Sequence, residues 1–396
     1  MTPPMFQAIR APLSSRALLV DLVRKHESIS RVELTEVTDL KAPTVSSAVK
    51  RLIDEGLVAE SGRGASTGGK PRTLLQLRRE ARYVIGAHLS FTSSTLVMLD
   101  FAGNLVSRIR RPWAPFGPDP VASIASWAEL IDDLIRRADV PRSRIVGVGA
   151  VCPGPLRQDD GLLSAPPDLA AWVGLPLRAM IEEAVGLPVI LDNDASAAAA
   201  GTTVLDEHDA SSGAVLFMSD GIGGGFRHLG EVFGGSQGNA CEVGHVCIDP
   251  DGPPCWCGAD GCLEALAGPG VVIERARTAG LIREDPEGST QTRFAEVARL
   301  ALRGNPAAAA IIEDSARWMA LGAQALVALL DPRVLVLSGP GFAVAGPLYL
   351  GEISRRIGLS AFGRLSDVEI IMDETGHDAA ATGAAKILLR SDAALI

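Results

Sequence analysis

One stretch of the sequence gathers most of the residues that can bind a metal ion. Residues 242–264, EVGHVCIDPDGPPCWCGADGCLE, contain one histidine and four of the six cysteines of the chain. Three of these thiols and the imidazole lie on short loops that contain glycine and proline, and together they form the donor set of a closed tetrahedral zinc site. The expected ligands are His245, Cys255, Cys257 and Cys262. Because four protein ligands leave no position for water, we expect a structural metal and no metal catalysis.

Two carboxylates flank the expected ligands. Glu242 and Glu264 lie at the two ends of the stretch, so a metal ion that orders the loop would also position both carboxylates. The alternative is a set of reduced, packed thiols. We expect that state for Cys152, Cys241 and Cys247, although Cys247 is near enough to compete as a ligand.

A second group of polar residues follows a buried strand. In residues 187–201, LPVILDNDASAAAAG, an apolar run ends at Asp192, Asn193 and Asp194, and an alanine-rich helix follows. Proteins of the α/β class bind ligands at the carboxyl ends of such strands. An aspartate placed there can deprotonate a hydroxyl group or hydrogen-bond to it. The alternative is an aspartate that caps the helix.

The composition favours a cytoplasmic protein with more than one domain. The 396 residues predict two or three domains, and a hydrophobic content of 47% suffices for a sizeable core. We find no apolar run of the roughly 18 residues that span a membrane, and no apolar region of a signal peptide. Six cysteines, four of them clustered, fit metal binding or free thiols better than a disulfide framework. We therefore expect no membrane partner.

The net charge of −10 divides unevenly along the chain. Residues 1–82 hold 14 Lys and Arg against 9 Asp and Glu, a net charge of +5. The remaining 23 basic and 38 acidic residues give residues 83–396 a net charge of −15. A basic module attached to an acidic body is typical of nucleic-acid binding, but five net charges are equally compatible with an ordinary solvated surface.

The basic piece has the pattern of a winged helix-turn-helix. Residues 30–33 match the S-x-x-E capping box that starts a helix, which we expect to run toward Asp39. A later helix has Pro43 in its first turn and an apolar face that extends from Val45 to Ile53. That face belongs to the core of the module, so the opposite face is free to bind a partner.

The outward face of this later helix carries small hydroxyl groups and cations, which suit a groove lined by phosphates and base edges. Strands at 57–60 and 73–77 enclose a glycine-rich loop, which we expect to lie as a wing along the DNA backbone. The residues expected to contact DNA are Lys41, Pro43, Thr44, Ser46, Ser47, Lys50, Arg51, Lys70 and Arg72. The alternative is a helical module that binds another protein through a charged face.

The acidic body repeats its own pattern of strands. The pattern that begins at Tyr83 returns near Gly213, which predicts two related lobes that close on a cleft. Residues 223–225 are three glycines after a strand, and they either approach a phosphate or form a tight hairpin. The alanine-rich stretch 316–330 is expected to be a helix, packed in the core or against a partner subunit.

Taken in order, these segments resemble the ROK family of repressors and sugar kinases, and within it the members with an N-terminal winged helix. The matching segments are PTVSSAVKRLIDEGLV, STGGKPRTLLQL, DNDASAAAAG, EVGH, CWCGADGCLE and GHDAAATGAA. The resemblance covers residues 16–389 and implies an α/β fold. A winged helix-turn-helix, residues 1–82, would precede an actin-like, two-lobed domain, residues 83–396. Lobe one would comprise about 83–200 and a C-terminal helix, and lobe two about 201–375.

The resemblance also implies a sugar site on a loop that structural zinc holds in place. The sugar-binding residues would be Asp168, Asn193, Asp194, Glu242, His245 and Glu264. His245 would use one ring nitrogen for the sugar and the other for zinc. The family usually has asparagine, asparagine and glycine where this chain has Asp168, Ser196 and Cys241, which bears on the sugar that fits.

The chain departs from the kinases of the family where they bind nucleotide. Kinases usually open lobe one with a D-G-G-T-K loop that serves the phosphates and their metal. The matching residues here are His88, Ser90, Phe91, Thr92 and Ser93, so the aspartate and both glycines are absent. Asp220 replaces a small or hydroxylic residue in the second glycine loop and would repel a triphosphate. We therefore expect that nucleotide binding is lost, which leaves Asp194, the residue matching the catalytic base, without a phosphoryl donor.

We interpret the chain as a sugar-responsive transcription repressor and not as an enzyme. A sugar or sugar phosphate would close the cleft and change the spacing of two DNA-binding heads. The expected partners are a palindromic operator and further copies of the chain, in a homodimer or homotetramer. Two alternatives are an ATP-dependent sugar kinase that also binds DNA, and a zinc-stabilised interaction protein without a sugar site. The sequence is also compatible with a regulator that senses a partner protein.

Overall fold

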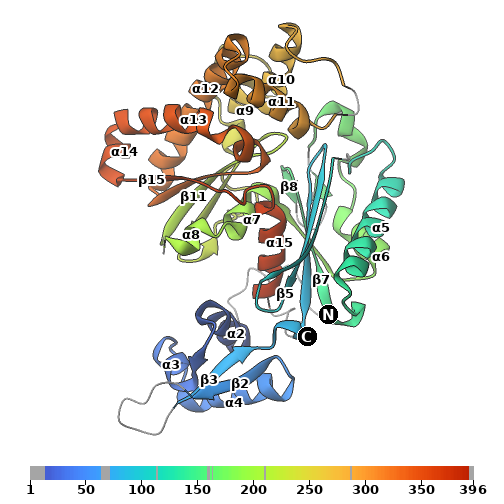
Figure 1. Ribbon diagram of the computed structural model, residues 1–396, viewed down its shortest axis with the longest axis vertical. Coiled ribbons are helices and arrows are strands. Elements are labelled where there is room, and N and C mark those ends of the chain that lie inside the picture. Colours follow the sequence, from blue (N-terminus) through green and yellow to red (C-terminus); the bar gives the residue numbers. More distant parts are fainter. Residues whose placement is uncertain are drawn as a thin grey trace.

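The computed structural model describes residues 14–63, 72–112, 115–157, 161–162, 164–208, 211–285 and 288–391. A small head lies at one end of a larger body, which is built on two five-stranded sheets (Figure 1). The expected mixed α/β class, with a helical head and a two-lobed body, is confirmed. Within the described ranges, every helix is too short or too polar to cross a membrane.

The head consists of helices packed on a three-stranded sheet with the order β1-β3-β2. The expected capping box is present, because the Ser30 hydroxyl accepts from the Glu33 N–H and the Glu33 carboxylate accepts from the Ser30 N–H. The helix that it starts ends at Glu36, before the expected Asp39. The elements are α2 (Ser15–His26), β1 (Ile29–Ser30), α3 (Arg31–Glu36), α4 (Ala42–Asp54), β2 (Val58–Arg63) and β3 (Thr73–Leu77).

Lobe one is built on a sheet with the order β10-β7-β4-β5-β6. β4, β5 and β6 pair antiparallel, whereas β7 and β10 run parallel to β4. β4 and β5 are buried along their whole length, as expected for strands covered on both faces. The elements are β4 (Tyr83–Leu89), β5 (Ser94–Asp100), β6 (Leu105–Arg111), α5 (Pro120–Ala138), β7 (Ile145–Cys152), β8 (Leu156–Arg157), β9 (Gly161–Leu162), α6 (Leu177–Val185) and β10 (Val189–Asn193).

Lobe two repeats this topology, with the sheet order β13-β12-β11-β14-β15, so the expected internal duplication is confirmed. Residues 316–330 belong to α12, where Met319, Ala323 and Val327 are buried, so the core interpretation of this stretch is right. The elements are α8 (Val204–Glu207), β11 (Ser212–Met218), β12 (Ile222–His228), β13 (Glu231–Val232), α9 (Leu263–Ala267), α10 (Pro269–Thr278), α11 (Thr290–Leu302), α12 (Pro306–Leu330), β14 (Val334–Ser338), α13 (Pro340–Leu359), α14 (Ala361–Ser366) and β15 (Glu369–Met372).

Two helices, α7 (Asp194–Gly201) and α15 (Ala379–Arg390), lie between the sheets (Figure 1). They cross so closely that a Cβ atom on Gly383 would lie 1.7 Å from the carbonyl oxygen of Ala197, and only glycine fits there. α7 starts where β10 ends, and α15 runs from this crossing toward the head (Figure 1). The two helices therefore link the space between the lobes to the head.

Candidate functional site

The expected metal ligands come together in a loop of lobe two. His245, Cys255, Cys257 and Cys262 each place one ligand atom within 4.8 Å of the other three. Cys255 Sγ lies 3.6 Å from His245 Nδ1, and Cys257 Sγ lies 3.6 Å from Cys262 Sγ. This cluster of one histidine and three cysteines can hold a metal ion.

The remaining cysteines lie outside the cluster. Cys247 is exposed on the same loop, and Cys152 is buried in β7. Cys241 has a φ of 64°, in the left-handed region where a residue with a Cβ atom is strained, which explains why the family usually has glycine there. Burial raises the pKa of the Cys241 thiol to about 11. Cys241 is not among the residues that line the cavity described below.

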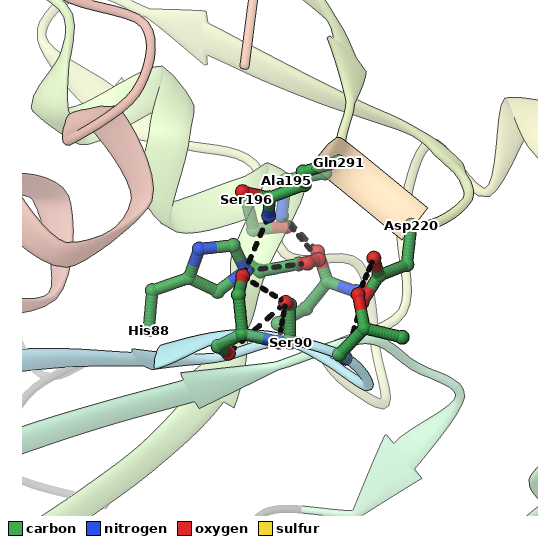
Figure 2. Close-up of polar contacts among 10 residues, drawn as sticks. His88, Ser90, Ala195, Ser196, Asp220 and Gln291 are labelled. Carbon is green, nitrogen blue, oxygen red and sulfur yellow. Dashed lines mark hydrogen bonds and ion pairs between the residues drawn. The ribbon is translucent and has the colours of Figure 1, made fainter. Parts of the chain in front are cut away.

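Asn193 and Asp194 stand where β10 ends and α7 begins. Asn193 caps the helix, since its Oδ1 accepts from the Ser196 N–H at 2.9 Å. The alternative in which an aspartate is the cap is therefore wrong. Asp194 Oδ1 accepts from the Ala195 N–H at 2.8 Å, and Asp194 Oδ2 lies 3.1 Å from His88 Nε2 (Figure 2). Both carboxylate oxygens of Asp194 thus have a partner within the protein.

Glu242 and Glu264 reach the same space from the metal-binding loop. Glu264 Oε2 accepts from the Ile222 N–H at 2.8 Å, and Glu264 Oε1 accepts from Trp256 Nε1 at 2.7 Å. Glu242 Oε1 is buried and has no hydrogen-bond partner among the described residues. Burial, followed by the charges of Asp194 and Glu264, raises the pKa of Glu242 to about 7. A buried acceptor in this state suits a hydroxyl donor from a ligand.

These side chains line a cavity of about 350 Å³ between the two lobes, a volume typical of small-molecule sites. Five of the six residues expected to bind sugar line it, namely Asn193, Asp194, Glu242, His245 and Glu264. The sixth, Asp168, belongs to a short 3-10 helix, Pro167–Trp172, and its side chain lies outside the described part of the structure.

Sequence reasoning missed Trp256, which lines the cavity and donates to Glu264. The Trp256 ring meets the His245 ring edge to face, with centroids 4.9 Å apart. The C-x-C spacing could have indicated this residue. Because Cys255 and Cys257 both place their sulfur atoms in the cluster, the side chain between them must point away from it. Trp256 thus contacts a residue of the cluster and a cavity carboxylate at once.

The turn between β4 and β5 is tied to lobe two by hydrogen bonds (Figure 2). Thr92 donates to Asp220 from its N–H at 2.8 Å and from its hydroxyl at 2.6 Å. The Thr290 N–H donates to the Thr92 hydroxyl at 3.1 Å, and Gln291 Nε2 donates to Ser93 Oγ at 2.7 Å. We call these five residues the clasp. Burial raises the pKa of Asp220, and the hydrogen bonds from Thr92 oppose this rise.

The three glycines at 223–225 lie in β12, the second strand of a tight hairpin whose turn is residues 219–221. A Cβ atom on Gly223 would lie 2.6 Å from Ala195 Cβ, and one on Gly225 would lie 2.5 Å from the Ala195 carbonyl oxygen. Gly223 and Gly225 let α7 pack directly on β12, whereas Gly224 lies against Cys241 and Val243.

The expected DNA contacts on α4 lie on the outside of the head. Val45, Val49 and Leu52 are buried against the rest of the head, so the opposite face is presented to solvent. The exposed residues are Lys41, Pro43, Thr44, Ser46, Ser47, Lys50 and Arg51. Arg72 is also exposed and pairs with Glu33 at 3.8 Å, whereas Lys70 and most of the expected wing lie outside the described residues.

Side-chain contacts at the end of α15 connect the head with the body. Arg390 pairs with Asp21 of α2 at 3.3 Å, and on its other side it donates to the Gly230 carbonyl and to Glu231 of lobe two, each at 2.7 Å. Arg24 of α2 donates to the Phe101 carbonyl at 3.2 Å and packs over the Phe101 ring. Arg390 therefore contacts the head and lobe two from the end of a helix that packs in lobe one.

An exposed recognition helix and an internal ligand cavity in one chain define a DNA-binding regulator that responds to a small molecule. Residues 16–59 match the model of winged helix-turn-helix DNA-binding domains, and residues 86–391 match the ROK family. The chain belongs to the ROK family.

Individual relatives include both regulators and enzymes. The xylose repressor of Caldicellulosiruptor bescii is 28% identical over 357 residues, which cover 88% of each chain. A glucokinase of Halalkalibacterium halodurans is 28% identical over 315 residues, 76% of this chain and 93% of the enzyme. The crystal structure of a ROK family transcriptional regulator, a homologue of the E. coli MLC protein, has the same fold, with a TM-score of 0.71, 21% identity and coverage of 94% and 98%.

Proposed function

We propose that the protein is a sugar-responsive transcription repressor whose effector binds between the lobes without being phosphorylated. The observation that carries this proposal is the cavity between the lobes, where Asn193, Asp194, Glu242, His245 and Glu264 converge. Carboxylates, an amide and an imidazole are the groups that hydrogen-bond sugar hydroxyls, and Glu242 retains a buried oxygen without a donor. The similarity to a xylose repressor over 88% of the chain supports the same function.

The metal that fits the cluster best is zinc. Thiolates about 2.3 Å from a tetrahedral zinc ion lie about 3.8 Å apart, and a thiolate and an imidazole nitrogen lie about 3.6 Å apart. The measured separations are 3.6 Å for Cys257 to Cys262 and 3.6 Å for Cys255 to His245. We propose that His245 gives Nδ1 to zinc and offers Nε2 to the sugar. Zinc would then organise the loop that carries Glu242, Trp256 and Glu264.

Several contacts in the site oppose phosphoryl transfer. The residue in place of the family's loop aspartate is His88, whose imidazole is a poor ligand for Mg²⁺, and it lies 3.1 Å from Asp194. Asp194 also accepts from the Ala195 N–H, so both of its carboxylate oxygens already have a partner within the protein. We propose that Asp194 binds the sugar and does not act as a base.

We propose that the head, residues 1–82, binds a palindromic operator while residues 83–396 form the sensor. Helix-turn-helix proteins commonly bind paired half-sites as dimers, so a homodimer, or a homotetramer with two such pairs, is the expected assembly. Operator binding would place the protein in the cytoplasm. The proposed DNA contacts are Lys41, Pro43, Thr44, Ser46, Ser47, Lys50, Arg51, Lys70 and Arg72.

Titration calorimetry of the zinc-loaded protein with a panel of hexoses, pentoses and amino sugars tests the sensor function. ATP with Mg²⁺ is titrated in parallel. We expect one sugar to bind, to weaken operator binding in a fluorescence anisotropy assay, and to remain unphosphorylated in the presence of ATP. Transfer of phosphate to the sugar would contradict the proposal and make the protein a kinase.

Trp256→Phe is expected to weaken sugar binding about 10-fold while zinc stays bound, because the variant removes one hydrogen bond to a charged carboxylate and keeps the ring. Calorimetry and metal analysis of the same sample measure both quantities. Trp318→Phe, at a half-buried position in α12 away from the cavity, is the matched control. An unchanged sugar affinity in Trp256→Phe would show that Glu264 does not need the indole N–H.

Lys50→Ala is expected to weaken operator binding roughly 10-fold and to reduce the slope of log affinity against log salt by about one, as expected for the loss of one phosphate contact. Anisotropy titrations at several salt concentrations measure the slope. Lys25→Ala removes the same charge from the end of α2 and serves as the control. Sugar affinity should not change in either variant. An unchanged operator affinity in Lys50→Ala would remove α4 from the interface.

A further inference from the structure

The clasp occupies the place where the kinases of the family have a phosphate-binding loop. In such a loop, backbone N–H groups face the phosphate. Here the Thr92 N–H donates to Asp220 at 2.8 Å, so a protein carboxylate takes the position of an anion (Figure 2). The Thr92 hydroxyl donates to the other oxygen of the same carboxylate at 2.6 Å. The donors of this turn are thus already used within the protein.

The clasp also joins the two lobes beside the cavity. Thr92 and Ser93 come from the β4–β5 turn of lobe one, whereas Asp220 and Gln291 come from lobe two. Phe91 of the same turn and Asp220 both line the cavity. A phosphate group could reach the Thr92 N–H only by displacing Asp220, which would break the two hydrogen bonds that Asp220 accepts from the other lobe.

The charge of the cavity also disfavours a phosphate group. Four carboxylates line it, those of Asp194, Asp220, Glu242 and Glu264, and among its lining residues in the described ranges we find no lysine or arginine. A phosphate dianion would lose water and meet these carboxylates without a compensating cation. An uncharged sugar would instead donate hydroxyl hydrogens to them.

Two helix N-termini at the cavity favour an anion, but the N–H groups of the first, that of α7, already donate to Asn193 and Asp194. Gly268 and Gly270, at the N-terminus of α10, line the cavity, and a helix N-terminus carries a partial positive charge of about one half. Half a charge does not offset several carboxylates. The electrostatic balance of the cavity therefore disfavours a phosphorylated ligand.

We infer that the effector is an uncharged sugar, and that the clasp, through Asp220, excludes both nucleotides and the phosphorylated form of the same sugar. This inference rests on the proposed sugar-sensing function and narrows its ligand class. It gives the clasp a role in ligand selection, because the carboxylate that joins the lobes is also the group that repels a phosphate.

Calorimetry with matched pairs tests the inference in the zinc-loaded protein. The probes are glucose, mannose and N-acetylglucosamine, each beside its 6-phosphate ester, which keeps the pyranose ring. For the sugar that binds, we expect the phosphate ester to bind at least about 100-fold more weakly, the size of effect known for an unpaired charge at a buried site. Equal or tighter binding of the ester would overturn the inference but leave the sugar sensor intact. Binding of neither form of any probe would overturn the sensor function itself.

Asp220→Asn tests the role of the clasp directly. The asparagine Oδ1 can still accept from the Thr92 N–H, so the turn keeps one of its hydrogen bonds while the charge is lost. We expect the affinity for the sugar divided by the affinity for its ester to be at least 10-fold smaller in Asp220→Asn than in the parent protein. Glu313→Gln removes a charge from an exposed position of α12 and should leave the ratio unchanged. The same ratio in Asp220→Asn and in the parent protein would exclude Asp220 as the selective group.

Discussion

Cys257→Ser is expected to release the metal ion and to weaken sugar binding by about 100-fold, the upper end of the effects known for residues that support a metal site. The loop from Glu242 to Glu264 contains little regular structure, so a bound metal ion would add four bonds to the backbone hydrogen bonds that already hold its shape. Its cavity residues lie next to metal ligands in the sequence: Trp256 lies between two of them, and Glu264 follows Cys262 by two residues. Cys257 is exposed, so the substitution leaves the core of lobe two in place.

Elemental analysis by plasma mass spectrometry and calorimetry of the same preparation measure the two effects of Cys257→Ser. Cys247→Ser is the matched control, because Cys247 is an exposed thiol of the same loop outside the cluster. The control should retain both metal and sugar binding. If Cys257→Ser loses the metal and keeps its full sugar affinity, the metal does not organise the sugar site.

Arg390→Ala is expected to abolish most of the sugar-induced loss of operator affinity, a coupling expected to lie between about 5-fold and about 150-fold in the parent protein. Arg390 contacts Asp21 of the head and Gly230 and Glu231 of lobe two. Closing of the lobes around a sugar would shift lobe two against the head through these contacts. Arg390 makes two ion pairs, and pairs near the surface contribute about 0.2–1 kcal/mol each, so the two together reach about 0.4–2 kcal/mol, which overlaps the lower part of a coupling free energy of about 1–3 kcal/mol.

Operator titrations with and without saturating sugar measure the coupling in Arg390→Ala. The sugar affinity and the operator affinity of the sugar-free protein should each stay within about threefold of the parent values, because Arg390 lies in neither site. The matched control is Arg277→Ala, which removes an exposed arginine that pairs with Glu274 of the same helix, α10. This variant should keep full coupling. A normal response to sugar in Arg390→Ala would place the connection between cleft and head elsewhere, for example at Arg24.

Local patterns made the head and the metal cluster predictable. The capping box is four residues long, and the metal ligands span residues 245–262, so neither depends on how distant segments pack. The repeated strand pattern likewise predicted two lobes with the same topology.

Contacts between distant segments could not be predicted in this way. Thr92 and Asp220 are 128 positions apart, and a sequence indicates neither that they meet nor that Asp220 accepts two hydrogen bonds. The contact between Asp21 and Arg390 depends on how the head sits on the body. Asp220 was expected to repel phosphate from its type alone, and its second role in joining the lobes needed the fold.

The position of α15 in the sequence gives the protein an order of assembly. During synthesis the head emerges and folds first, whereas α15, which packs on β4 and carries Arg390, emerges after both sheets. A nascent or truncated chain that stops before Ala379 would contain the whole DNA-binding head but neither the helix that completes lobe one nor its junction with the head. Such a fragment would keep the residues of the cavity but lack the contacts that Arg390 makes with the head and with lobe two, so the order of elements places this connection after both sheets.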